Sequence, residues 1–115
     1  MKLCLFFLGA VTVFSSCYYD VEEELYGGQV CDTPLSVNWS HIKPLIETHC
    51  NNGNCHVVNG IGLGVFDSYA GVKAKVDNGS FASRVLDIRD MPGYSLPACD
   101  YVLLEAWLDA GAPEN

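Results

Sequence analysis

The chain has 115 residues, 50% of them hydrophobic, and its 6 Lys or Arg are outnumbered by 14 Asp or Glu, giving a net charge of −8. An acidic chain of this kind is repelled by phosphate backbones and by anionic lipid, so the composition argues against nucleic-acid binding and against electrostatic adhesion to a membrane. A single small domain buries little core and usually needs a disulfide, a metal or a cofactor for stability.

The N-terminal segment 1–16 has the pattern of a secretory signal peptide. Lys2 precedes the apolar run 3–14, and small residues follow that run. The run is too short to span a bilayer, which takes about 20 apolar residues. Phe14-Ser15-Ser16-Cys17 resembles a bacterial lipobox, and this resemblance implies that Cys17 is the lipidated first residue of the mature protein. A plain signal peptide, with Cys17 as an ordinary thiol, is the alternative.

Residues 17–30 are expected to form an acidic tether. Acidic residues just after the lipid-bearing cysteine resemble the surface-export signal of Bacteroidetes-type lipoproteins, as in Tyr18-Tyr19-Asp20-Val21-Glu22-Glu23-Glu24. We therefore expect an outer-membrane lipoprotein of the cell envelope, periplasmic or surface-exposed, that contacts the membrane through its lipid anchor only. Removing the signal takes away Lys2 and no acidic residue, so the net charge changes from −8 to −9. The folded domain is expected to be residues 31–115.

The segment 39–49 is predicted to be the first helix. Residues on one face recur at helical spacing: Ile42, Leu45, Ile46 and His49. Asn38 or Ser40 could cap this helix. Pro44 is compatible with it in the first turn and would otherwise kink it.

The segment Cys50-Asn51-Asn52-Gly53-Asn54-Cys55-His56 follows directly and carries most of the functional signal. Covalent attachment of haem uses two thiols that bond to its vinyl groups and a histidine that ligates the iron, usually as C-x-x-C-H. Here four residues separate the cysteines. They are three Asn and one Gly, which tolerate left-handed backbone and form compact loops. We expect a loop that brings Cys50 and Cys55 to one porphyrin edge, with His56 as iron ligand.

Four cysteines remain once Cys4 leaves with the signal and Cys17 is assigned to lipid, and four thiols allow three disulfide connectivities. If haem takes Cys50 and Cys55, then Cys31 and Cys99 are left to pair. That disulfide would close a long loop and stabilise the domain by about 3–5 kcal/mol.

The rest of the domain is predicted to contain short helices joined by turns. The glycine-rich run 59–64 is expected to be a loop that could pass close to a ligand. Asp67 could cap a helix over 68–75, and Ser80 could cap one over 81–86. The last helix is predicted over 98–110, started by Pro97 and ended by Gly111. Its apolar stripe is expected to be Val102, Leu103, Ala106, Trp107 and Ala110, widened by Leu104 and Leu108.

Met91 is the candidate for the second axial iron ligand. It lies in the turn Asp90-Met91-Pro92-Gly93-Tyr94 and is the only methionine after the signal peptide. A thioether opposite an imidazole raises the potential of a haem iron and suits an electron carrier. A core gap-filler is the structural alternative for Met91. His41 and His49 are the competing ligands, although both are expected to lie on the first helix.

Several segments together resemble the small class-I-like cytochrome c domains of Bacteroidetes and planctomycete secreted lipoproteins. The matching pieces are Ile42-Lys43-Pro44-Leu45-Ile46, Cys55-His56, Phe66-Asp67-Ser68-Tyr69, Arg89-Asp90-Met91-Pro92-Gly93 and Ala106-Trp107-Leu108-Asp109-Ala110-Gly111-Ala112-Pro113. The resemblance covers the chain from Cys31 onward. It implies an all-α cytochrome c fold with crossing first and last helices. It also implies thioether bonds at Cys50 and Cys55, with His56 as the proximal iron ligand and Met91 as the distal one. The long Cys-to-Cys spacing departs from the family pattern.

These observations favour a haem-binding electron-transfer lipoprotein that is not an enzyme, whose redox partner is basic-faced or docks through apolar contacts. One alternative is a haem-free cytochrome-c-like domain that serves as a binding or structural module and has a Cys50–Cys55 disulfide. Others are a zinc site, with a fourth donor from His49 or His41, or a haem enzyme such as a peroxidase. Hydrolysis has little support, because neither a Ser-His-Asp order nor a G-x-S-x-G motif occurs.

Overall fold

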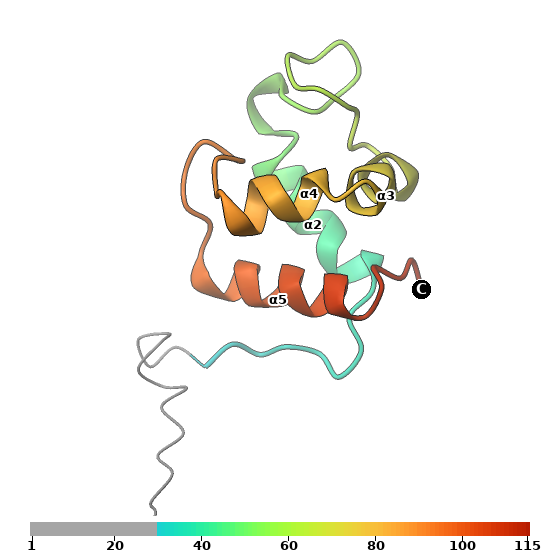
Figure 1. Cartoon of the computed structure of the whole chain (residues 1–115), viewed down its shortest axis with the longest axis vertical. Helices are drawn as coiled ribbons and strands as arrows, with labels where there is room; N and C mark the ends of the chain where they lie inside the picture. The colour runs from blue at the N-terminus through green and yellow to red at the C-terminus, as the bar shows by residue number, and fades with distance from the viewer. Residues whose placement is uncertain (1–29) are drawn as a thin grey trace, which may run out of the picture.

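The computed structural model describes residues 30–115, which fold into an assembly of short helices (Figure 1). The predicted signal peptide, Cys17 and the tether up to residue 29 lie outside the described residues. The elements are α2 (Trp39–His49), the 3-10 turn η1 (Asn52–Asn54), α3 (Tyr69–Asp77), α4 (Ser80–Ala82), the π-helical turn η2 (Ser83–Asp87) and α5 (Ala98–Asp109). Residues 30–115 contain no strand, so the prediction of a helical chain is confirmed. No helix in this range is long and apolar enough to cross a membrane.

The first helix, α2, has the predicted bounds and begins with a capping box at Asn38. The Asn38 side chain accepts a hydrogen bond from the Ser40 amide at 3.1 Å, and the amide of Asn38 donates to Nδ1 of His41 at 3.2 Å. These bonds satisfy amides that have no partner inside the helix. Pro44 lies in the second turn, not the first, where it lacks the N–H that would bond to the Ser40 carbonyl.

Two of the predicted helix starts are wrong by one residue. Ser68, not Asp67, caps α3, because its side chain accepts a hydrogen bond from the Gly71 amide at 3.4 Å. Ser80 is the first residue of α4 and not its cap. The chain turns between α3 and α4 at Gly79, whose φ of +78° favours glycine.

The core forms where α2 packs against α5. At one end, the ring centroids of Trp39 and Trp107 are 6.0 Å apart, and the Trp39 amide donates to the Pro113 carbonyl at 3.0 Å. At the other end, His49 of α2 lies beside Asp100 in the first turn of α5. The two helices therefore run in opposite directions. Trp107 is fully buried, and its Nε1 donates to the same Pro113 carbonyl at 3.0 Å, which satisfies a polar atom in the core.

The buried face of α5 differs from the predicted stripe. Its fully packed residues are Tyr101, Leu104 and Trp107, whereas Ala110 is exposed. The apolar residues of this helix cover so much of its circumference that their spacing alone did not fix its rotation. The hydroxyl of Tyr101 accepts a hydrogen bond from the Leu96 amide at 3.2 Å, which holds this face inward.

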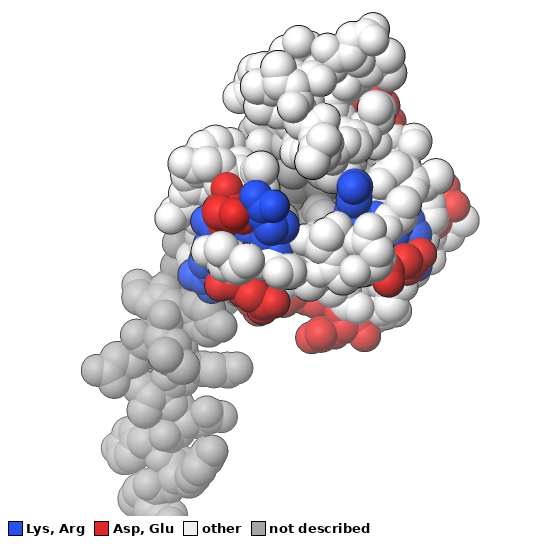
Figure 2. Space-filling model, turned by 45° about the horizontal axis from the view of Figure 1, so that its top comes forward, with Lys and Arg blue, Asp and Glu red and all other residues white. Residues whose placement is uncertain are grey.

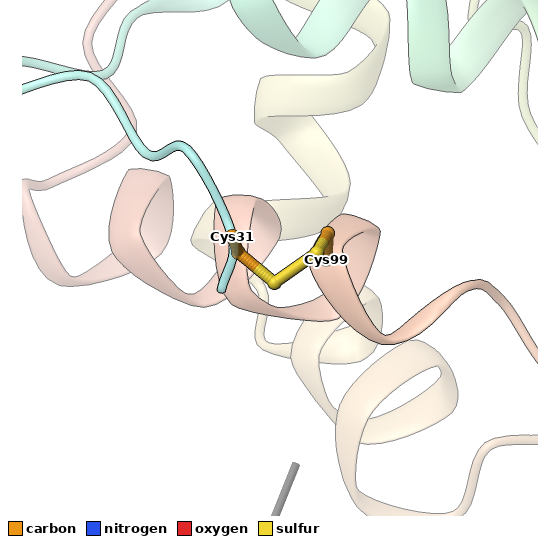
Figure 3. Close-up of a disulfide and its surroundings, with 2 residues drawn as sticks. All are labelled: Cys31 and Cys99. Atoms are coloured by element: carbon orange, nitrogen blue, oxygen red, sulfur yellow. A yellow bond between two sulfur atoms is a disulfide. The ribbon is translucent and has the colours of Figure 1, made fainter. Parts of the chain in front are cut away.

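A disulfide joins Cys31 to Cys99, as predicted, across 68 residues of sequence (Figure 3). It attaches the extended segment that precedes α2 to the first turn of α5. Closing a loop of this length restricts the unfolded chain and so stabilises the domain.

Candidate cofactor site

The loop from Cys50 to His56 is compact and folds back on itself. Gly53 and Asn54 both have left-handed backbone, with φ of +66° and +64°. The His56 amide then donates to the Cys50 carbonyl at 3.1 Å, so the two ends of the loop lie together. The predicted compact loop is confirmed, and it brings both thiols to the wall of the same cavity as His56.

The imidazole of His56 is held in a defined orientation. Its Nδ1 lies 3.2 Å from the carbonyl oxygen of Gly64, and its ring stacks on Phe66 with centroids 4.2 Å apart and planes 7° apart. A carbonyl can only accept a hydrogen bond, so Nδ1 carries a proton, and in the neutral imidazole the lone pair is then on Nε2. A histidine fixed in this way by its other nitrogen is the usual arrangement of a metal ligand.

The glycine-rich loop makes the orientation of His56 possible. A Cβ atom on Gly62 would lie 2.7 Å from Nδ1 of His56, and one on Gly60 would lie 2.2 Å from the Cys55 carbonyl oxygen. The Gly62 amide also donates to that Cys55 carbonyl at 2.9 Å. The glycine-rich run was expected to pass close to a ligand. In the structure it lies against the backbone of Cys55 and the ring of His56.

A cavity of about 600 Å³ lies between this loop and the helices, visible as the hollowed face in Figure 2. Cys50, Cys55 and His56 line it together with Met91. Its volume is within the range of small-molecule and cofactor sites, which is roughly 300–1,000 Å³. The four residues predicted to bind haem thus line one cavity, although they are up to 41 positions apart in sequence (50 to 91).

Met91 reaches the cavity from the turn after η2. The amide of Met91 donates to the Arg84 carbonyl at 3.2 Å, and the amide of Tyr94 donates to the Pro92 carbonyl at 2.7 Å. The Met91 side chain is 39% exposed, which is unlike a core gap-filler. These bonds hold the turn beside η2, and Met91 lines the cavity.

Cys50 and Cys55 are both free thiols, so the local disulfide of the haem-free alternative is not formed. Burial, with a smaller contribution from Cys55, raises the pKa of Cys50 to about 11. Cys50 therefore keeps its proton at neutral pH. Nucleophilic catalysis uses the thiolate, so this environment does not favour Cys50 as a nucleophile.

The other two histidines are occupied by protein groups. His49 also lines the cavity, but its Nδ1 lies 2.9 Å from the Tyr94 hydroxyl and its Nε2 lies 3.1 Å from Asp100 Oδ2. His41 accepts the capping hydrogen bond at the start of α2. The fourth donor that a zinc site would need is thus engaged elsewhere. Within residues 30–115, no cluster of three or more His, Cys, Asp or Glu side chains is arranged to hold a metal ion.

Several groups in this site were not predicted from the sequence. They are the Gly64 carbonyl and the Phe66 ring that orient His56, the Tyr94 hydroxyl that bonds His49, and the cations Lys75 and Arg84 on the cavity wall. The glycine-rich run 59–64 was the one local signal, and it indicated the contact made by the Gly64 carbonyl. The others depend on contacts between segments that are distant in sequence.

Comparison of the chain with protein-family models, with curated proteins and with solved structures gave no match.

Proposed function

We propose that this protein is a covalent haem-binding electron-transfer lipoprotein with a cytochrome-c-like fold. The observation that carries the proposal is the convergence of Cys50, Cys55, His56 and Met91 on one cavity of about 600 Å³. These are the groups that a c-type haem needs: two thiols for its vinyl carbons, an imidazole and a thioether. Iron in such a haem supplies reversible one-electron transfer.

The chain's own residues have separate tasks in this proposal. Cys50 and Cys55 would hold the porphyrin edge, and the Gly64 carbonyl keeps the lone pair of His56 on Nε2, available to the iron. Met91 would bind the iron through its thioether together with His56, and a haem iron with two protein ligands suits electron transfer better than a peroxidase activity. Apolar side chains such as Phe81 and Val85 line the same cavity and would limit access of water.

The helical arrangement also supports a cytochrome-c-like fold. The first and last helices of the domain pack on each other, and the loop that follows α2, green in Figure 1, rises on the side away from α5. The cavity lies between this loop and the segment from α3 to Tyr94, as its lining residues indicate. The lipid anchor of the proposal rests on Cys17, which lies outside the described residues.

The test is to express the chain with its signal sequence in a bacterium that attaches c-type haem, and to purify the mature protein. We expect a Soret band that survives acid–acetone extraction and a mass increased by one haem. Replacing Cys50 and Cys55 by Ser should abolish the covalent haem, whereas replacing Cys31 and Cys99 by Ser removes the same number of cysteines outside the cavity and should leave attachment possible.

A colourless protein with the mass of the polypeptide and its disulfide would reject the proposal. The haem-free alternative, a binding or structural module of the cell envelope, would then be preferred. The four-residue spacing between Cys50 and Cys55 is the observation that favours this second candidate, since it departs from C-x-x-C-H.

A further inference from the structure

The charges on the cavity wall are opposite in sign to the charge of the protein. Asp and Glu outnumber Lys and Arg by 14 to 6 in the whole chain. Among the residues of the described range 30–115 that line the cavity there is no Asp or Glu, and the two permanently charged residues are Lys75 and Arg84. Figure 2 shows Lys and Arg atoms on both sides of the hollowed face. A cavity with this lining attracts a ligand that carries negative charge.

Lys75 is a half-buried cation on α3, and it has no ion-pair partner within residues 30–115. Its side chain lies against the glycine-rich loop: a Cβ atom on Gly64 would be 2.9 Å from Cε and 3.7 Å from Nζ of Lys75. Gly64 has a φ of +99°, a conformation that other residues rarely adopt. The loop therefore leaves room for this side chain beside the cavity.

Arg84 is on η2, next to the turn that carries Met91. Its Nε donates to Asp90 Oδ1 at 2.7 Å, and its backbone carbonyl accepts the amides of Asp90 and Met91 at 3.1 and 3.2 Å. A guanidinium has five N–H donors in a planar fork, so the bond to Asp90 leaves the terminal nitrogens available for another carboxylate.

We propose that Lys75 and Arg84 form a carboxylate-binding site in this cavity that recognises the two propionate groups of haem. The assignment rests on the proposed function. Haem has two vinyl groups and, away from them, two carboxylates. With the vinyl groups bonded at Cys50 and Cys55, the carboxylates need cationic partners elsewhere on the wall. Lys75 and Arg84 are the permanently charged cations that line the cavity within residues 30–115.

The experiment measures affinity and not electron transfer. The full chain, purified without attached haem, is titrated with iron protoporphyrin IX and with its dimethyl ester, which lacks the two negative charges. We expect wild-type protein to bind the free acid more tightly than the ester. Lys75→Met or Arg84→Met should each weaken binding of the free acid by roughly tenfold and leave binding of the ester unchanged, since each removes one charge-assisted contact.

Lys73→Met is the matched control, because Lys73 lies on the same helix but pairs with Asp77 and does not line the cavity. It should leave both affinities unchanged. Lys75→Arg and Arg84→Lys keep the charge and should keep the preference for the free acid. In wild-type protein, which needs no variant to fold, the preference should diminish as salt is raised.

Two outcomes separate this site from the proposed function. In the first outcome, both porphyrins bind, but wild-type protein shows no preference for the free acid, or Lys75→Met and Arg84→Met keep that preference. Either result rejects the carboxylate site while haem binding stands. If neither porphyrin binds wild-type protein, the proposed function is rejected and the carboxylate site with it.

Discussion

Nδ1 of His56 lies 3.2 Å from the carbonyl oxygen of Gly64, and this contact determines which nitrogen of His56 can bind a ligand. It depends on Gly62, because a Cβ atom there would lie 2.7 Å from Nδ1 of the same ring. The glycine-rich loop thus both supplies the acceptor and makes room for the imidazole.

Gly62→Ala should displace the His56 ring. The added methyl group overlaps the imidazole, so we expect a loss of about 1–3 kcal/mol in the free energy of unfolding and reduced haem loading. Denaturant unfolding measures the loss in the free energy of unfolding. The NMR shifts of the imidazole nitrogens report the change of tautomer at His56. Gly93→Ala is the control for the unfolding measurement, because a Cβ atom on Gly93 meets no protein atom within 4 Å; it is not a control for haem loading, because Gly93 lines the cavity. Equal behaviour of the two variants would contradict this role of Gly62.

Met91→Ala should change the iron ligation of the haem-loaded protein without preventing haem attachment. If Met91 is the distal ligand, the weak sulfur-to-iron absorption at the red end of the spectrum disappears and the reduction potential falls. Ile88→Ala is a suitable control, since Ile88 is 62% exposed and does not line the cavity. An unchanged spectrum in Met91→Ala would reject Met91 as a ligand.

Cys50 should make the haem-free protein less stable at alkaline pH. Its ordinary pKa is 9.0, and burial raises it to about 11 in the folded state. Between these values the folded state binds more protons than the unfolded state, so the free energy of unfolding falls as pH rises, by at most about 2–3 kcal/mol. Below pH 9.0 the contribution is fully present.

The measurement is denaturant unfolding from pH 8 to 11 without reductant or oxygen, at roughly half-unit steps. Cys50→Ser should flatten this pH dependence. Cys55→Ser should keep most of it, because burial is the larger cause of the raised pKa. A slope that is the same in wild type and Cys50→Ser would show that other groups cause it.

Replacing Cys31 and Cys99 by Ser should destabilise the domain. The disulfide closes a loop across 68 residues, for which the loss of chain entropy predicts about 4 kcal/mol. Peptide mapping of the haem-free protein without reduction should find the Cys31–Cys99 pair and free thiols at Cys50 and Cys55. A Cys50–Cys55 disulfide found in that map would contradict the structure.

Tyr94→Phe should loosen the turn that carries Met91. It removes the 2.9 Å contact between the Tyr94 hydroxyl and Nδ1 of His49, and we expect a loss of about 1 kcal/mol. In a His49→Gln background the same change should cost less, because its partner is gone. Additive effects of the two substitutions, measured by denaturant unfolding, would show that the pair does not interact.

Local sequence signals predicted the helices well where capping and spacing act within a few residues. The bounds 39–49 follow from Asn38 and the apolar spacing, and Gly111 follows the last helix with φ of +86°. The face of α5 that points into the core was not predictable from such local signals. Its apolar residues leave several faces possible, and the contacts of Tyr101 and Trp107 with other segments select one.

The sequence by itself determined the small helical domain, the compact Cys50–His56 loop and the residue types suited to haem. These depend on backbone preferences and on the spacing of neighbouring side chains. Tertiary structure decided that Met91 lines the same cavity as His56 and that the Gly64 carbonyl orients the imidazole. It also decided that His49 contacts Tyr94 and Asp100. Finally, it placed the cations Lys75 and Arg84 on the cavity wall. Each of these joins segments far apart in the chain, so only the packing of the helices brings them together.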